Sequence, residues 1–305
     1  MHVYGWVLFN LFVVLLLLID LGVFHKGSRE IGIKESLVWS VIWTLVALLF
    51  NVGIYFWFGH VKALEFFTCY VIERSLSFDN LFVFVLIFNY FRVKSEYQYE
   101  VLFWGIVGAM VMRALFIVAG TALISKFHWV IYILGAVLVY MGVKLAFQEE
   151  HEIHPEKNPV LKLAKKLFPI SGWQDSSKFF IRNPVLLMTP LFLVLLVVES
   201  SDIVFALDSV PAALAISLNA FIVYSSNILA ILGLRALYFA LAASMRLFCY
   251  LNYGIAVVLT FVGLKMLLTD YFIISITYSL GFVMLVLGIS IALSLIKPLK
   301  PLKAP

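Results

Sequence analysis

Residues 73–80 read Glu-Arg-Ser-Leu-Ser-Phe-Asp-Asn and lie inside a long apolar run. An ionised side chain in the bilayer core costs roughly 2.5–3.5 kcal/mol on insertion scales, so it usually faces a cavity or a partner and marks an ion or proton pathway. A second stretch, residues 199–208, reads Glu-Ser-Ser-Asp-Ile-Val-Phe-Ala-Leu-Asp. Each stretch holds two acids six residues apart: Glu73 and Asp79, then Asp202 and Asp208. The functional prediction made below rests on this repeated acidic motif.

The composition indicates a membrane protein. Of the 305 residues, 64% are hydrophobic and 13% are charged, and the mean hydropathy is +1.06, whereas a soluble domain carries about 25% charged residues. The net charge of +5 does not indicate nucleic-acid binding, because most of the excess lies in loops and the C-terminal tail. The two cysteines, Cys69 and Cys249, lie in or beside apolar segments, so we expect small core residues and no disulfide scaffold, haem or zinc site.

The chain contains nine apolar runs of about 20 residues, the length that spans a bilayer as a helix. We therefore predict an all-α polytopic membrane protein with nine transmembrane helices. The first run is not preceded by Lys or Arg and is not followed by a clear cleavage site, so we expect a retained span. The predicted spans are 4–24, 36–58, 66–91, 99–124, 129–147, 185–212, 219–244, 250–269 and 273–296.

Basic residues set the expected orientation. Successive connecting segments alternate between many and few Lys and Arg residues, and the richest is the long segment 148–184. The positive-inside rule then places the N-terminus outside and the C-terminus in the cytoplasm. Residues 159–169 of the long segment alternate apolar and basic residues at helical spacing, which predicts an amphipathic helix on anionic lipid headgroups.

The same cytoplasmic segment holds a second group of candidate ligands. Glu149, Glu150, His151, Glu152 and His154 lie close together in sequence. They could bind a metal ion, but a solvated charged loop is the alternative that we favour.

An internal repeat relates two sets of three spans. Arg113 matches Arg235 at an offset of 122, Gly142 matches Gly263 at an offset of 121, and the acids of the first motif match those of the second at an offset of 129. Because each set crosses the membrane three times, the second copy begins on the side where the first ended, so the copies must be inverted. The predicted units are 1–65 (two N-terminal spans), 66–148 (repeat 1), 149–184 (cytoplasmic loop), 185–270 (repeat 2) and 271–305 (ninth span and basic tail).

Carboxylate and amide oxygens in the repeats predict a site for a hard divalent cation such as Mn²⁺, Ca²⁺ or Mg²⁺. Clustered Cys and His ligands, which favour Zn²⁺ or Cu⁺, do not occur in the spans. Arg113 and Arg235 fall in mid-span, where each needs a carboxylate or carbonyl partner; either structural pairing or a substrate role would satisfy them. The candidate metal ligands are Glu73, Asp79, Asn80, Glu199, Asp202 and Asp208, with Asp20, Arg113 and Arg235 as accessory residues.

The six-residue spacing raises a geometric problem. Six residues of straight helix place two side chains about 120° apart around the axis and ~9 Å apart along it. We therefore expect breaks in the third and sixth spans, with Pro190 and Pro211 removing backbone hydrogen bonds in the sixth. The rival interpretation is that one acid of each pair binds the ion while the other pairs with arginine.

The two acidic motifs and the residues Ile-Leu-Gly-Leu-Arg-Ala at 231–236 resemble the TerC family over nearly the whole chain, and within it the Alx-like branch. The resemblance implies a bacterial inner-membrane protein that exports Mn²⁺. It also implies that the functional acids are Glu73, Asp79, Glu199, Asp202 and Asp208. Arg74 stands where this branch often has Lys, which keeps the charge.

These observations predict a secondary transporter of divalent cations, with no resident cofactor and with protons as the simplest exchanged ion. A runner-up is a membrane partner protein that delivers metal to exported enzymes, with segment 148–184 as the docking surface for protein partners. An intramembrane aspartyl hydrolase is a third candidate, but its Gly-x-Gly-Asp motif is not present in the chain. We therefore expect a carrier and not an enzyme.

Overall fold

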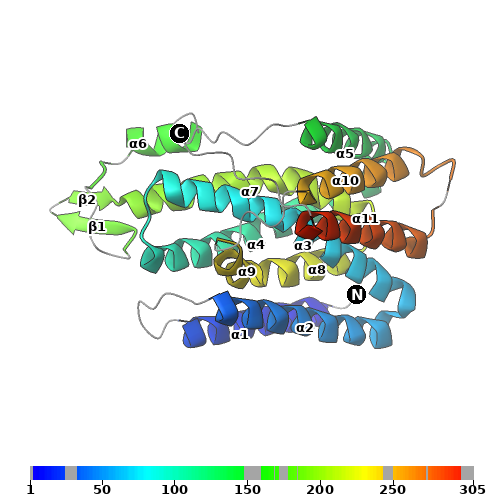
Figure 1. Cartoon of the computed structure of the whole chain (residues 1–305), viewed down its shortest axis with the longest axis horizontal. Coiled ribbons are helices and arrows are strands. Elements are labelled where there is room, and N and C mark those ends of the chain that lie inside the picture. Colours follow the sequence, from blue (N-terminus) through cyan, green and yellow to red (C-terminus); the bar gives the residue numbers. More distant parts are fainter. Residues whose placement is uncertain are drawn as a thin grey trace.

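The computed structural model describes residues 3–24, 33–147, 159–167, 169–171, 178–183, 185–242, 250–272 and 274–296. Within these ranges the chain is a bundle of helices that run along the long axis of the molecule (Figure 1). A short antiparallel hairpin extends one end of the bundle (Figure 1). The elements are α1 (Val3–Phe24), α2 (Ile33–Phe58), α3 (His60–Tyr90), α4 (Ser95–Lys126), α5 (Val130–Phe147), α6 (Pro159–Leu167), β1 (Phe180–Asn183), β2 (Val185–Met188), α7 (Pro190–Leu214), α8 (Ala220–Leu232), α9 (Leu234–Ala242), α10 (Leu251–Leu267) and α11 (Ile276–Ile296).

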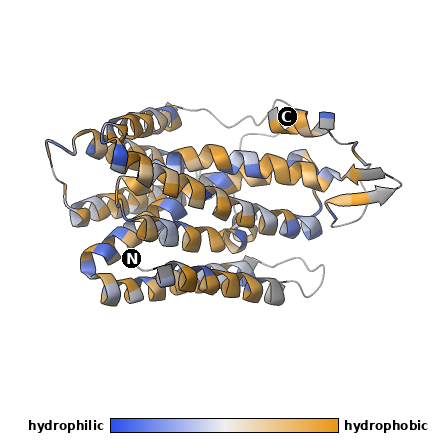
Figure 2. Cartoon of the chain, turned by 180° about the vertical axis from the view of Figure 1, so that it is seen from behind, coloured by the Kyte–Doolittle hydropathy of each residue, from blue (hydrophilic) through white to orange (hydrophobic). Residues whose placement is uncertain are grey.

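The helices identify a polytopic membrane protein. Among the described residues, 6 helical segments are long and apolar enough to cross a bilayer: 34–58, 95–126, 130–147, 190–214, 220–240 and 276–294. Shorter apolar helices cover 4–20 and 251–267. Hydrophobic residues extend over most of the length of the helices (Figure 2), and many large apolar side chains on the outer helices are exposed. Such faces are stable in lipid, where each helix satisfies its own backbone hydrogen bonds.

Two predicted boundaries are wrong. The expected sixth span begins at residue 185, but residues 185–188 form strand β2, and the helix begins only at Pro190. The side chain of Thr189 accepts a hydrogen bond from the amide of Phe192, which caps the helix at that point. The expected seventh span is divided between α8 and α9.

The predicted breaks in the third and sixth spans are also wrong, because α3 and α7 are continuous helices. Pro190 is the first residue of α7, where its missing amide hydrogen costs little. Pro211 lies in the last turn of α7, and the helix continues to Leu214. A proline so close to the end of a helix removes one hydrogen bond without dividing the helix in two.

The interruption lies instead at Gly233, between α8 and α9. The guanidinium of Arg74 on α3 donates to the carbonyl of Ala230 at 3.0 Å and to the hydroxyl of Ser40 on α2 at 2.9 Å. A Cβ atom at Gly233 would lie 2.5 Å from this guanidinium. A cation that binds the last carbonyls of a helix stabilises its C-terminus, so Arg74 holds the end of α8.

Helix α8 lies at the centre of the bundle, and every residue from Phe221 to Leu232 is buried. It packs against α3 and α4, and α3 and α4 both pack against α7. Glycines allow the close approach of α4 to α7, because Gly105 faces Val198 and Gly120 faces Leu214. These four helices position the site described below.

Helix α6 is the predicted amphipathic helix, two residues shorter than expected at its C-terminal end. Leu161 and Ala164 are buried, and the helix packs against α7. Lys162, Leu163 and Lys166 are exposed on the other side.

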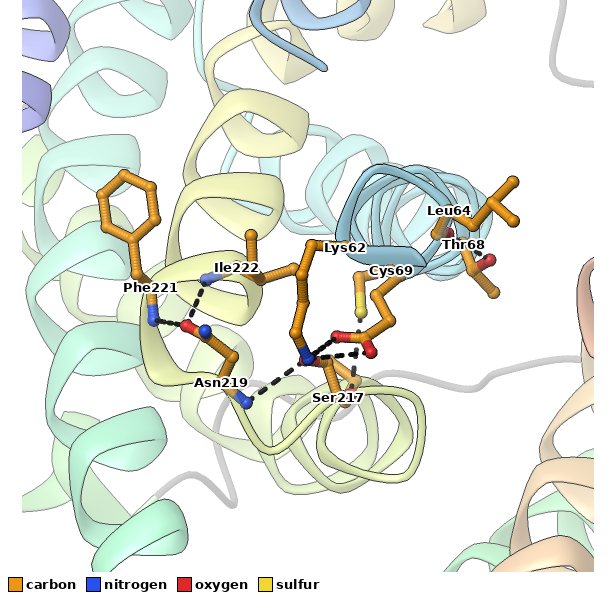
Figure 3. Close-up of polar contacts among 10 residues, drawn as sticks. Lys62, Leu64, Thr68, Cys69, Ser217, Asn219, Phe221 and Ile222 are labelled. Atoms are coloured by element: carbon orange, nitrogen blue, oxygen red, sulfur yellow. Dashed lines mark hydrogen bonds and ion pairs between the residues drawn. The ribbon is translucent and has the colours of Figure 1, made fainter. Parts of the chain in front are cut away.

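At one end of the bundle, the start of α3 meets the turn between α7 and α8 (Figure 3). Lys62 donates to both carboxylate oxygens of Glu65, at 2.9 and 2.8 Å, and the hydroxyl of Ser217 donates to the same carboxylate. The side chain of Asn219 accepts hydrogen bonds from the amides of Phe221 and Ile222 and so caps α8 (Figure 3). The thiol of Cys69 is buried and lies 3.6 Å from the carbonyl of Ala213, as expected for a small core residue, whereas Cys249 lies outside the described residues.

Helices α5 and α10 pack through glycines, and this packing is the basis of a first prediction. A Cβ atom at Gly263 would lie 2.7 Å from the carbonyl oxygen of Gly135 and 2.8 Å from the amide nitrogen of Val139. We expect Gly263→Ala to destabilise the protein by about 1–3 kcal/mol, because backbone atoms must move apart. Thermal unfolding of the purified protein in detergent measures the change.

The matched control is Gly288→Ala on α11, where a Cβ atom would meet nothing within 4 Å. Because alanine favours a helix over glycine by up to about 1 kcal/mol, this variant should be as stable as the parent protein or slightly more stable. Equal effects of the two substitutions would contradict the packing described for α5 and α10.

Candidate functional site

A buried arginine lies where α3, α4, α7 and α8 meet. Arg113 of α4 is 0% exposed and forms an ion pair with Glu73 of α3. A second ion pair joins its guanidinium to Asp202 of α7 across 3.6 Å. The guanidinium also donates to the hydroxyl of Ser209 at 2.8 Å and to the amide oxygen of Asn227 at 3.1 Å. One cation is therefore surrounded by four side-chain oxygens from three other helices.

The carboxylates of this group are not fully satisfied. Oε2 of Glu73 and Oδ2 of Asp202 are buried and have no hydrogen-bond partner among the described atoms. The side-chain amide nitrogen of Asn80, seven residues after Glu73 on α3, is also buried and has no hydrogen-bond partner among the described atoms. Two carboxylates share one guanidinium, so the group has an excess of negative charge and spare oxygen lone pairs.

A second buried ion pair joins α1 to α9. Arg235 is paired with Asp20, and both side chains are buried. The guanidinium of Arg235 also lies over the ring of Tyr99 on α4, with its central carbon 4.3 Å from the ring centre. A pair of this kind holds α1 against the bundle, because neither charge has water available as an alternative partner.

The remaining acids of α7 lie on either side of Asp202 along the helix. Glu199 is partly buried and lies against Gly108 of α4, where a Cβ atom would overlap its carboxylate. The carboxylate of Asp202 interacts electrostatically with Glu199, and the ammonium of Lys144 on α5 interacts electrostatically with Asp208. Oδ1 of Asp208 is buried and has no hydrogen-bond partner within the described part of the chain.

The structure thus brings some of the predicted ligands together and leaves others apart. Glu73 and Asp202 meet at Arg113, and this agrees with the interpretation that one acid of each pair binds arginine. Among the described side chains, no group of three or more His, Cys, Asp or Glu residues is placed to hold a metal ion. The side chain of Asp79 and the cluster Glu149, Glu150, His151, Glu152 and His154 lie outside the described residues.

The sequence analysis missed Asn227 as a member of this site. The residue lies in the middle of a predicted span, within the run Ser225-Ser226-Asn227. A polar amide at that depth of a bilayer is costly unless it has a partner, and this cost is the signal that could have identified it. His128, Tyr132 and Asp270, which meet at one end of the bundle, were not predicted from the sequence either.

These last three residues form an exposed contact beyond the end of α10. The hydroxyl of Tyr132 donates to one carboxylate oxygen of Asp270, and Nε2 of His128 lies 3.3 Å from the other. The hydrogen bond from Tyr132, followed by that from His128, holds the pKa of Asp270 below its ordinary value. Because the folded-state pKa is lowered, the contact stabilises the protein at neutral pH, and this stabilisation is lost as the pH falls through that pKa.

The fold and the site define a polytopic helical membrane protein with charged side chains buried between its helices. The chain belongs to the TerC family: the sequence model of the integral membrane protein TerC family matches residues 58–300. No solved structure matches the chain.

Similar proteins come from several bacteria. An "Uncharacterized membrane protein STKORF319" of Myxococcus xanthus is 46% identical over 293 residues, which cover 96% of this chain and 92% of the relative. A protein of Escherichia coli K12 named "Putative membrane-bound redox modulator Alx" is 42% identical over 290 residues, 91% of this chain and 90% of the relative. An "Uncharacterized membrane protein" of Rickettsia bellii is 38% identical over 288 residues, 93% of this chain and 95% of the relative.

The pair of Asp20 and Arg235 supplies a second prediction. Asp20→Ala leaves a buried guanidinium without its carboxylate, and breaking a buried pair in this way costs about 3–5 kcal/mol. We expect a marked fall in the thermal stability of the purified protein. Lys62→Ala is the control, because the side chain of Lys62 is 35% exposed in its pair with Glu65 and the Glu65 carboxylate keeps the hydrogen bond from Ser217, so its loss should cost clearly less than the loss of Asp20. Similar losses in the two variants would contradict a structural role for Asp20.

Proposed function

We propose that the protein is a secondary transporter that exports divalent metal cations, with Mn²⁺ as the main cargo and Ca²⁺ as a second. The observation that carries this proposal is the excess of buried carboxylate oxygen at the centre of the bundle. Glu73 and Asp202 share one guanidinium, and each keeps one oxygen without a hydrogen-bond partner among the residues that the structure describes. Hard oxygen donors of this kind suit Mn²⁺, Ca²⁺ and Mg²⁺. The proposed route of the cation passes Glu73, Asp79, Asn80, Glu199, Asp202 and Asp208.

The proposed architecture is nine membrane-spanning segments around two inverted repeats, α3–α5 and α7–α10. Contacts between α5 and α10 support it. A Cβ atom at Gly142 would lie 2.7 Å from the carbonyl of Ala256 and 2.8 Å from the amide of Thr260. Adding the repeat offset of 121 to Gly142, Gly135 and Val139 gives Gly263, Ala256 and Thr260, so this contact is the counterpart of the one at Gly263. Exchanging the repeats also exchanges the packing of α4 on α7 with that of α8 on α3.

Inverted repeats suggest a mechanism of alternating access. One triplet of helices would rock against the other around a site near the middle of the membrane, as in other transporters built from such repeats. Carboxylates in a low dielectric exchange protons for cations readily, so inward proton movement is the proposed coupling. The distribution of Lys and Arg supports a bacterial inner-membrane protein with its N-terminus outside and its C-terminus in the cytoplasm. The pair of Asp20 and Arg235 would have a structural part, joining α1 to the second repeat.

The name of the Escherichia coli relative refers to redox modulation. The one cysteine among the described residues, Cys69, is 0% exposed, so it is not placed for thiol exchange with another protein. The alternative function, delivery of metal to exported enzymes through a docking surface in segment 148–184, differs in requiring a second protein.

A third prediction tests transport directly. The purified full chain in liposomes should move Mn²⁺ without any other protein, and Asp208→Asn should abolish the flux because it removes a carboxylate from the proposed route. Fluorescence of a trapped Mn²⁺-sensitive dye measures the flux, and a panel of divalent cations gives the selectivity. Glu96→Gln, in the first turn of α4 and exposed, is the control and should leave the flux unchanged.

The results separate the alternatives. Flux that needs an added partner protein would favour metal delivery, and full activity in Asp208→Asn would place the route elsewhere. Flux that is indifferent to an imposed pH gradient would remove proton coupling while leaving transport intact.

A further inference from the structure

The four groups that surround Arg113 are all oxygen donors. They are the carboxylates of Glu73 and Asp202, the hydroxyl of Ser209 and the amide oxygen of Asn227. We call these four residues the oxygen cage. Mixed carboxylate, hydroxyl and amide oxygens form the ligand set that a hard divalent cation requires. The groups that solvate the arginine are thus the groups that would solvate a metal ion.

We infer that the oxygen cage is the binding site of the transported cation, with Ser209 and Asn227 as neutral ligands, and that Arg113 is a tethered cation that occupies it between transport events. This inference rests on the proposed function and adds that Arg113 competes with the transported cation for the site. The cargo enters only when the guanidinium leaves.

Electrostatics explains why such a competitor would be needed. Glu73 is 1% exposed and Asp202 is 4% exposed, and a buried carboxylate that loses its cationic partner is strongly destabilising. Removing a divalent cation from two such carboxylates would leave both charges without a partner. A guanidinium that returns to the cage removes most of this cost, so the carrier can change conformation without cargo.

The positions of the residues on the helices make the exchange mechanically simple. All four cage residues lie on α3, α7 and α8, whereas the competing cation lies on α4. A movement of α4 within its own triplet, separate from the rocking of the two triplets, would therefore withdraw the guanidinium and leave the cage residues together. Gly105, Gly108 and Gly120 lie along the face of α4 that contacts α7, and small residues at a helix interface permit such close sliding contacts.

The test measures binding of Mn²⁺ to the purified, chelator-treated full chain by isothermal titration calorimetry. A competitor that fills the site nine-tenths of the time weakens apparent affinity by roughly tenfold. We expect Arg113→Gln to bind Mn²⁺ roughly tenfold more tightly than the parent chain, and to transport it more slowly because nothing displaces the bound ion. Asn227→Leu in the Arg113→Gln background should weaken binding again, because it removes a ligand.

Arg113→Lys keeps the experiment decisive if Arg113→Gln does not fold. An ammonium retains the charge but has three donors in place of the planar fork of arginine, so it competes less well and affinity should rise, by a smaller factor than in Arg113→Gln. Arg235→Lys is the matched control at the repeat-equivalent arginine, which is paired with Asp20, and it should leave affinity unchanged.

The outcomes distinguish the two proposals. If the parent chain binds and transports Mn²⁺ but neither variant of Arg113 binds it more tightly, Arg113 is purely structural and this inference is wrong while the transporter stands. If the parent chain neither binds nor transports any divalent cation, the proposed function fails and this inference fails with it. An equal gain in affinity in Arg235→Lys would also overturn it, because the effect would not come from the cage.

Discussion

A guanidinium with no access to water constrains the whole interior of this protein. Arg113 is fully buried, so its charge must be balanced by protein groups, and it draws these groups from α3, α7 and α8. The contacts fix the rotation and the axial register of four helices at once. In a bilayer the apolar surfaces of helices do not drive their own association, because lipid tails are equally apolar, so packing and polar contacts decide which helices meet. Here the packing of small residues and this one charged contact act together.

The location of the helices could be predicted from the sequence because hydropathy depends on composition alone. Each of the nine apolar runs contains helix, and the amphipathic helix after Pro159 is present. The breaks could not be predicted in the same way. Pro211 has little effect because it lies in the last turn of α7, and this position depends on where the helix ends. The interruption at Gly233 is accompanied by a contact from Arg74, 159 residues earlier in the chain, which no local pattern reveals.

The residues of the candidate site could likewise be predicted only in part. The acids could be identified because a carboxylate in an apolar run is costly wherever it points. Their partners could not be identified, because pairing depends on the register between helices. Glu73 and Asp202 meet the same arginine, while Asp20 on α1 meets Arg235 on α9. Asn227 could not be identified for a related reason. Amide groups are common in spans as contacts between helices, and only the direction of the side chain shows that the amide oxygen of Asn227 accepts a hydrogen bond from Arg113.

The two arginines also show where the symmetry of the sequence must fail. Glu73 matches Asp202 and Arg113 matches Arg235 in sequence, and the structure joins both acids to Arg113. The second arginine then needs a different anion, and Asp20 of α1, a helix outside the repeated segments, supplies it. Asp20 on the N-terminal helix α1 thus neutralises a guanidinium that lies apart from the shared pair of carboxylates.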